Sequence, residues 1–296
     1  MRIFSPSYYK SFKCIAEKCT HSCCVGWEID IDEKSLHRYE KAEGKYPDEI
    51  RKSIEYGDTP HFRLRENERC PHLDERGLCR IIIECGEDFL CDICKEHPRF
   101  YNETSLGLEV GIGMACEEAA RIILSSDGYA DFGGEAEPCD GFDAVAERER
   151  IYKILSDNSL PYEARLKKIY ESYGIAPTAT ADEEWHEIIS SLEYLDEGHR
   201  DAFLCYSSDT KTPKRYEKIL ERALAYFIFR HASARDNEED SRAALGFACF
   251  MERLFASLLK SDSDGEKNAI TLARIISEEI EYSEDNTEEI MQNFIF

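Results

Sequence analysis

Two kinds of hydrophobic pattern divide the chain near residue 126. Before it, apolar positions come in short groups with no sustained helical period, which is typical of irregular structure. The pattern there predicts strands over 27–31, 61–64 and 106–112, and helices over 33–42, 78–85 and 116–125. Asp32 is a suitable N-cap for the first helix, and Gly86 ends the second.

The second half of the chain has a helical period throughout. Four glycines and one proline among acidic residues make 127–141 a candidate linker. Beyond it, helices are predicted over about 142–157, 161–173, 182–196, 213–232, 237–260, 267–282 and 285–294. Pro161 and Pro213 stand at helix starts, where proline is tolerated. We therefore predict a mainly α protein: an irregular cysteine-rich region with a few short strands over 1–126, and an α-helical domain over 142–296.

The charge of the chain is strongly acidic and unevenly spread. The net charge of the 296 residues is −24, of which −5 falls in residues 1–116 and −19 in residues 117–296. Nucleic-acid binding is disfavoured, because phosphates need a basic face. A basic protein partner or a lysine-bearing substrate is compatible with this charge, although solubility alone explains it more simply. The sequence leaves the oligomeric state open.

Ten of the thirteen cysteines lie in the first 116 residues, and residues 14–24 read CIAEKCTHSCC. Crowded thiolates are unfavourable unless a cation lies among them, which indicates a metal or iron–sulfur site. The N-terminal residues lack the apolar stretch of a secretory signal, and the longest apolar runs are too short to span a membrane. We therefore predict a cytoplasmic protein with reduced thiols and no membrane segment, which favours a metal over disulfides.

The spacing of the cysteines is compatible with more than one kind of metal centre. Cys91 and Cys94 form a C-x2-C pair that suits one metal, and four thiolates complete either one zinc site or one cubane cluster. The sequence supports one or two centres. The compact C-x4-C-x3-C-C run favours cluster ligation over zinc, and a metal staple without chemistry is the alternative. The isolated Cys139, Cys205 and Cys249 are predicted to be buried packing residues.

Two familiar enzyme signatures are incomplete. Radical S-adenosylmethionine enzymes use C-x3-C-x2-C; Cys19 and Cys23 have the first spacing, but Gly26 stands at the third position. Residues 108–113, LEVGIG, resemble a nucleotide-binding turn, yet Ala115 replaces the third glycine and only helices follow. These glycines more simply indicate a close backbone approach in a cysteine-rich site.

Several motifs together resemble one family. They are YYKSFKC at 8–14, the C-x4-C-x3-C-C run followed by Gly26-Trp27, GLC at 77–79, GED-x-LC-x2-C at 86–94, Pro98-Arg99, and C-x-EAAR at 116–121. The later segments AYF-x-FRH at 225–231 and EEIEYSEDN at 278–286 add to them. With these motifs the chain resembles the flagellin lysine-N-methylases, within a broader group of cysteine-rich zinc- or iron-chelating proteins, over nearly its whole length.

The resemblance implies methyl transfer from S-adenosylmethionine to the ε-amines of flagellin lysines. It also implies an iron–sulfur cluster, 4Fe-4S with zinc as the alternative, held by the cysteines that match the family pattern: Cys14, Cys19, Cys23, Cys24, Cys70, Cys79, Cys91, Cys94 and Cys116. Cys85 is an extra cysteine at a position expected to be apolar, and His97 stands where an aromatic residue usually precedes Pro-Arg.

Methyl transfer needs a neutral amine, so a carboxylate or tyrosine that removes its proton is expected. Glu118 and Tyr101 are the candidate catalytic residues, although solvated or capping roles explain them too. Arg99 and Arg121 are candidates for binding a cofactor carboxylate or an anionic cluster. Arg230-His231 follows an apolar helix and is predicted to be a buried, satisfied pair.

Two other functions fit the same pattern. A non-catalytic zinc- or iron-binding module that docks other proteins would explain the thiols and the acidity without a cofactor pocket. An electron-transfer partner would use a reversible cluster and would not bind S-adenosylmethionine.

Overall fold

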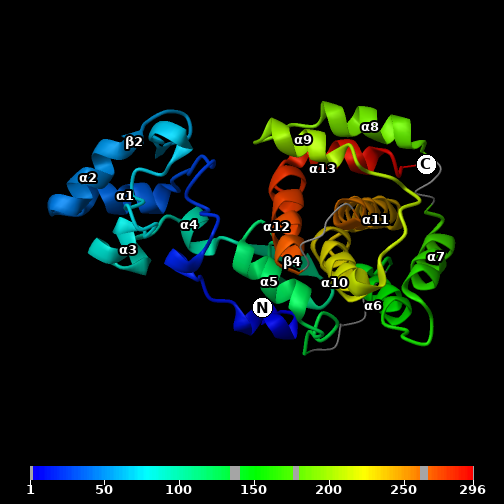
Figure 1. The fold of residues 1–296 in the computed structure, drawn as a ribbon. Helices are drawn as coiled ribbons and strands as arrows, with labels where there is room; N and C mark the ends of the chain where they lie inside the picture. Colours follow the sequence, from blue (N-terminus) through cyan, green and yellow to red (C-terminus); the bar gives the residue numbers. More distant parts are fainter. Residues whose placement is uncertain (1–2, 134–140, 176–179, 261–265, 296) are drawn as a thin grey trace. The chain divides into compact units, whose positions relative to one another are not determined.

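The computed structural model describes residues 3–133, 141–175, 180–260 and 266–295. These divide into two compact units: a cysteine unit, Lys13–Pro98, and a helical unit, formed by Met1–Phe12 and Arg99–Phe296 (Figure 1). The division differs from the predicted boundary, because residues 99–126, with Cys116, are part of the helical unit. Of the predicted linker over 127–141, residues 134–140 lie outside the described residues.

The cysteine unit is built from short elements joined by turns. Its helices and strands are α1 (Glu33–Lys41), α2 (Lys45–Ser53), β2 (Ile54–Glu55), β3 (His61–Phe62), α3 (Arg80–Cys85) and α4 (Asp92–Glu96), with 3-10 turns at Ala16–Lys18, Glu66–Glu68 and Glu87–Phe89. β2 pairs antiparallel with β3. A small apolar core centres on Tyr39, Ile50 and Phe62, each at most 1% exposed.

The predicted elements of this unit are confirmed in part. The Asp32 carboxylate accepts a hydrogen bond from the Ser35 N–H at 2.8 Å and so caps α1 as expected. The helix predicted over 78–85 is confirmed as α3, which ends before Gly86. The strand predicted over 27–31 is wrong, because this stretch makes only an isolated pair of Asp30 with His61. The sequence analysis missed α2 and α4.

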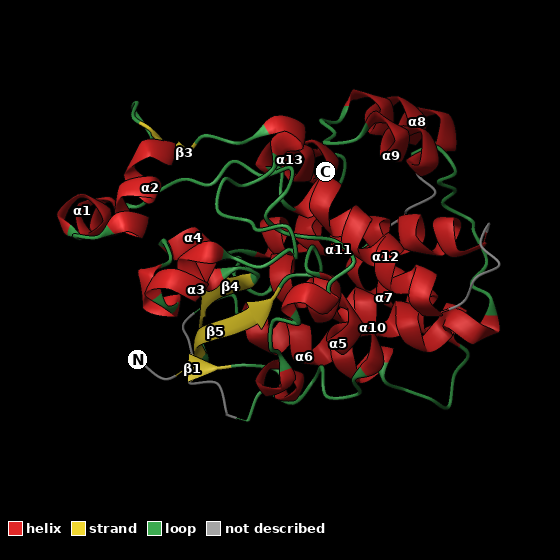
Figure 2. Ribbon diagram, turned by 60° about the vertical axis from the view of Figure 1, so that its left-hand side comes forward, coloured by secondary structure: helices red, strands yellow, loops and turns green. Residues whose placement is uncertain are grey.

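The helical unit contains a three-stranded sheet (Figure 2). Its strands are β1 (Ile3–Phe4), β4 (Arg99–Thr104) and β5 (Gly107–Ile112), in the order β1-β5-β4. β5 runs antiparallel to β4 and parallel to β1, and only helices follow it in the described chain, so no doubly wound sheet is present there. A side chain at Gly111 would overlap the rings of Phe100 and Phe229, so the predicted close approach is confirmed. The predicted cysteine-rich surroundings are wrong, because Gly111 belongs to the helical unit and faces aromatic rings.

Helices form the rest of this unit, with α11 in their midst, packed against α9, α10, α12 and α13 (Figure 1). The bounds are α5 (Glu117–Ser125), α6 (Ala144–Leu155), α7 (Tyr162–Tyr173), α8 (Asp182–Ser191), α9 (Glu197–Phe203), α10 (Glu217–Phe227), α11 (Glu238–Lys260), α12 (Glu266–Ile276) and α13 (Glu284–Gln292). A 3-10 turn covers Ser7–Ser11 and another covers Lys214–Tyr216. α10 continues into a π-helical turn at Ile228–Ala232, and α12 into another at Ser277–Glu281.

The prediction of a mainly helical protein is thus confirmed. The stretch predicted as one helix over 182–196 ends at Ser191, and α9 follows separately. Cys249 is buried, as predicted, whereas Cys205 is exposed, so its packing role was wrong; Cys139 lies outside the described residues. In the described part of the chain, no helix has both the length and the apolar character that crossing a membrane requires.

Candidate metal centre and buried polar cluster

The cysteine unit brings together thiols from separate stretches of its sequence. The Cys70 N–H donates to the Cys24 carbonyl oxygen at 2.8 Å, which pairs the first cysteine run with the middle of the unit. Cys79 directly precedes α3; Cys91 directly precedes α4, and Cys94 lies within it. Cys70 and Cys91 belong to the apolar core, and Cys24, Cys79, Cys85 and Cys94 pack against it. The five other than Cys85 interact electrostatically with one another and are called the five-cysteine group below.

Burial and mutual proximity change the acidity of these thiols. Burial raises the pKa of Cys70 to about 12, and the neighbouring Cys24, Cys79 and Cys91 add to the shift. A hydrogen bond from Cys23 lowers the pKa of Cys24 to about 7, against the effect of burial. A hydrogen bond from the Cys94 thiol lowers the pKa of Cys91 and raises that of Cys94. A thiolate is therefore most stabilised at Cys24 and Cys91.

The five-cysteine group fits a soft metal centre in its donor chemistry. All its cysteines are free thiols that interact electrostatically with one another. Among the described residues, no three cysteine sulfurs lie within 4.8 Å of one another. Four thiolates around one zinc ion would lie about 3.8 Å apart, given a Zn–S distance of about 2.3 Å. A four-iron cluster is larger and holds its sulfurs further apart than a single zinc ion does.

Four further predicted ligands do not belong to the five-cysteine group. Cys14 is exposed, and the Cys19 thiol donates to the His21 carbonyl oxygen at 2.7 Å. Cys23 is exposed beside Cys24. Cys116 directly precedes α5 in the helical unit. The structure thus gathers five of the nine predicted ligands with Cys23 beside them, and the ligand roles stay predictions.

The predicted catalytic and cofactor-binding residues lie on β4 and α5. Arg99 donates from Nε to the Tyr9 hydroxyl at 3.0 Å, and Tyr101 is 49% exposed. Glu118 is buried and accepts two hydrogen bonds from Arg121, at 2.6 and 2.7 Å. These bonds raise the pKa of Arg121. Glu118 and Arg121 neutralise each other. Each could therefore bind a ligand only if its hydrogen bonds to the other were broken.

A buried polar cluster, formed by Tyr226, Arg230, His231 and Glu281, joins the two π-helical turns. The Tyr226 hydroxyl donates to Glu281 Oε2 at 3.1 Å, and accepts from Arg230 at 2.8 Å and from the Met114 N–H at 3.1 Å. His231 Nε2 lies 2.7 Å from Glu281 Oε1. The cluster therefore also anchors the loop between β5 and α5. π-helical turns occur frequently at functional sites.

The charges of this cluster are set by burial and ion pairing. Burial acts to raise the pKa of Glu281, but Arg230 and His231 outweigh it, so this pKa lies below its usual range. Burial lowers the pKa of His231, which is therefore neutral at pH 7. A neutral His231 that donates from Nε2 to Glu281 keeps a lone pair on Nδ1, so it can accept a proton.

The sequence analysis found only part of this cluster. Arg230 and His231 were predicted as a buried, satisfied pair, and the contacts of both side chains with Glu281 confirm it. Glu281 was missed because it stands among six other acidic residues between 278 and 289, and nothing local distinguishes it. Only the second π-helical turn brings it to His231.

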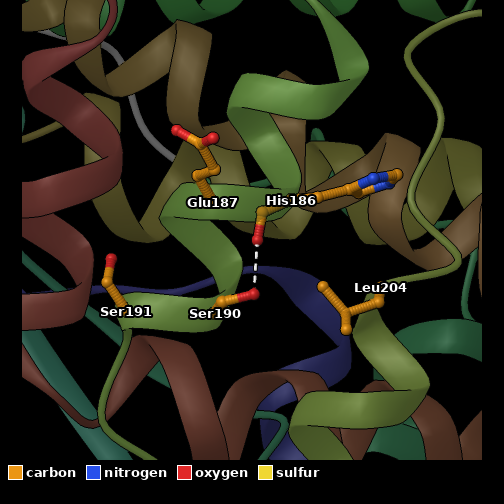
Figure 3. A pocket seen from close by; sticks show the side chains of 5 residues that line it. All are labelled: His186, Glu187, Ser190, Ser191 and Leu204. Carbon is orange, nitrogen blue, oxygen red and sulfur yellow. Dashed lines mark hydrogen bonds between the residues drawn. The ribbon is translucent and has the colours of Figure 1, made fainter.

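A surface hollow of about 480 Å³ lies between α8 and α9 and is lined by His186, Glu187, Ser190, Ser191 and Leu204 (Figure 3). The His186 and Glu187 side chains point away from each other (Figure 3). His186 Nε2 is bonded to the Tyr206 carbonyl oxygen at 2.9 Å, and Ser190 donates to the His186 carbonyl oxygen at 2.6 Å. The hollow thus contains none of the predicted site residues, and its imidazole already uses Nε2 in a backbone contact.

These features define a class: a mainly helical protein with a thiol-rich unit and a buried acid–imidazole–phenol cluster. No protein-family model matches the chain. No solved structure matches it either.

Curated relatives do match. Over 132 residues the chain is 25% identical to the flagellar biosynthetic protein FliU of Salmonella muenchen, an alignment that covers 42% of this chain and 77% of FliU. It is also 25% identical over 132 residues to the lysine-N-methylases of Salmonella typhimurium and Salmonella choleraesuis, where the match spans 32% of each. The resemblance to the lysine-N-methylases is therefore confirmed, over 42% of this chain rather than nearly all of it.

Proposed function

We propose that this chain is a protein-lysine N-methyltransferase that transfers methyl groups from S-adenosylmethionine to flagellin lysines. The observation that carries the proposal is the match to proteins named lysine-N-methylase and to FliU, whose name is flagellar. The chain matches about a third of the length of the lysine-N-methylases, so the activity, the flagellin partner and the cytoplasmic location are all proposals.

The five-cysteine group would hold the metal centre, an iron–sulfur cluster with zinc as the alternative. Its set of free, mutually interacting thiols supports this assignment. Cys14, Cys19, Cys23 and Cys116 are the further ligands that the resemblance proposes. When bound, such a cluster supplies a centre whose iron can gain or lose an electron.

Methyl transfer places definite demands on the residues of the chain. The lysine nitrogen forms a bond to the methyl carbon while the sulfur–methyl bond breaks, and the sulfonium becomes a neutral thioether. Because only the neutral amine has a free electron pair, a group must take the ammonium proton. Glu118 and Tyr101 remain the proposed acceptors. Arg99 and Arg121 remain proposed to bind the carboxylate of S-adenosylmethionine.

The test uses anaerobically purified protein. We would measure its visible absorbance with its iron, sulfide and zinc content, then incubate it with flagellin and S-adenosylmethionine and determine the mass of the flagellin. The proposal predicts a coloured protein. It also predicts that the mass of flagellin increases in steps of one methyl group. Glu118→Gln and Tyr101→Phe should each slow the reaction without changing the metal content.

Cys205→Ser is the matched control, because it removes an exposed thiol from the helical unit. It should keep both colour and activity. An iron-loaded protein that adds no methyl group to flagellin would overturn the proposal. A colourless, zinc-loaded and inactive protein would favour the non-catalytic binding module.

A further inference from the structure

A small cavity lies on the cysteine unit, between α2, the start of α3 and the 65–72 segment. Its volume is about 180 Å³, and it is lined by Glu49, Lys52, Ser53, Arg65, Pro71, His72 and Arg80. At about 30 Å³ for each water molecule in the liquid, this is room for roughly six waters. Whole cofactors need pockets of about 300 Å³ or more. The cavity therefore suits a small ion or a fragment of that size.

The charged groups of this cavity are mostly positive, although the cysteine unit as a whole has a net charge of −6. Arg80 lies 3.2 Å from Glu49, and this is the cavity's one ion pair among the described residues. Arg65 donates to the Pro71 carbonyl oxygen, which carries no charge. Lys52 has no ion-pair partner in the part of the chain that the structure describes. Two of the three positive charges are therefore not neutralised.

The two guanidinium groups are held in place before any ligand binds. Arg80 lies 4.6 Å from the centre of the Tyr46 ring, which restricts its motion. Arg65 is held by its bond to Pro71. A preorganised pair of guanidinium groups loses little side-chain entropy on binding, and its flat N–H donors match the oxygens of carboxylates and phosphates.

Buried His72 forms a fully bonded wall of the cavity. Its Nδ1 lies 3.0 Å from the Tyr46 hydroxyl and its Nε2 lies 2.9 Å from Ser53 Oγ. Because Ser53 donates its own proton to the Ile50 carbonyl oxygen at 2.6 Å, its oxygen must accept from His72 Nε2. Both ring nitrogens are therefore already bonded, and the attraction for an anion comes from the three cations that line the cavity.

We propose that this cavity is a binding site for a small oxyanion, either a phosphate or a carboxylate, held by Arg65 and Arg80 with Lys52 at the rim. The site is separate from the methyl-transfer function proposed above and does not depend on it. Its ligand would neutralise the two unpaired positive charges and would tie α2 to the start of α3.

The test is binding of inorganic phosphate and, separately, of acetate, by titration calorimetry and by the rise in thermal midpoint, with chloride at equal ionic strength as the blank. The full-length protein is used as purified. Arg65→Gln and Lys52→Gln should each weaken binding of the preferred anion roughly tenfold, the value expected for losing one charge-assisted hydrogen bond. Lys52 is exposed and has no ion-pair partner among the described residues, so its variant should fold even if Arg65→Gln does not.

Arg63→Gln is the matched control, because it removes the same charge two residues from Arg65. Arg63 is exposed, pairs with Glu55 at 3.3 Å, and does not line the cavity. It should bind the anion like the unaltered protein. Binding of phosphate alone or acetate alone supports the site and identifies the source of the oxyanion. Absence of binding by both anions, or equal weakening by Arg63→Gln and Lys52→Gln, would overturn the proposal.

Discussion

Glu281→Gln tests the physical account of the buried polar cluster. The Glu281 side chain is fully buried; its carboxylate accepts from Tyr226 and contacts His231, and it lies 3.6 Å from Arg230 Nε. Breaking a buried ion pair costs about 3–5 kcal/mol. The cost here should be lower, about 2–3 kcal/mol, because the amide keeps a hydrogen bond and the Arg230 side chain is 13% exposed. A unit of this size loses roughly 2–4 °C per kcal/mol, so the midpoint should fall by about 4–12 °C.

The assay is chemical unfolding monitored by circular dichroism, with thermal scans beside it. Glu284→Gln is the control, because Glu284 is an exposed acid in the first turn of α13 and its loss should change stability by no more than about 0.5 kcal/mol. If Glu281→Gln were no more destabilising than Glu284→Gln, the cluster would not be a buried ion-paired network, and the reasoning would be refuted.

Three further predictions concern pH, metal content and the helical core. The hydrogen bond to Glu279 raises the pKa of His199 above its usual 6.5. This pair should therefore stabilise the fold below pH 6.5 and lose its effect as the pH rises through the folded-state pKa. The difference in unfolding free energy between the unaltered protein and His199→Gln should shrink as the pH rises, and a constant difference would contradict the prediction. Cys91→Ser should reduce the metal content of the purified protein, whereas Cys85→Ser, at the extra cysteine, should not. Metal analysis would show this, and equal losses would count against the five-cysteine group. Trp185→Ala should destabilise the helical unit by about 3–5 kcal/mol in urea unfolding, because its ring is fully buried and packs against other aromatic rings. A loss under about 1 kcal/mol would mean that the core collapses around the gap.

Local sequence signals predicted the elements whose ends are chemically marked. Asp32 begins α1, and Pro161 directly precedes α7, because a side-chain oxygen or a proline meets the needs of a first helical turn. The strand predicted over 27–31 failed for a physical reason. Alternation gives a strand only when a partner strand is present, and here the opposite segment offers a single paired residue, His61.

The π-helical turns are invisible in the sequence, since the hydrophobic period of 213–232 and of 267–282 runs through them without a break. Each turn has a side-chain amide bonded to one of its carbonyl groups. Asn102 donates to the Phe229 carbonyl oxygen at 2.9 Å, and Asn286 donates to the Glu279 carbonyl oxygen at 2.8 Å. These bonds satisfy carbonyl groups in the widened turns. Asn102 is distant in the sequence from the turn that it contacts, and Asn286 belongs to the next helix, α13.

The sequence by itself determined the helical character of the second half, the sulfur-rich chemistry of the first, and the resemblance to the lysine-N-methylases, because each depends on residue types and short spacings. Tertiary structure alone decided which thiols meet, since Cys24, Cys70, Cys79 and Cys91 come from stretches that only the folded backbone brings together. It also decided that Cys116 belongs to the helical unit and that Glu281 faces His231. Long-range contacts of this kind depend on the packing of whole elements, which no local pattern encodes.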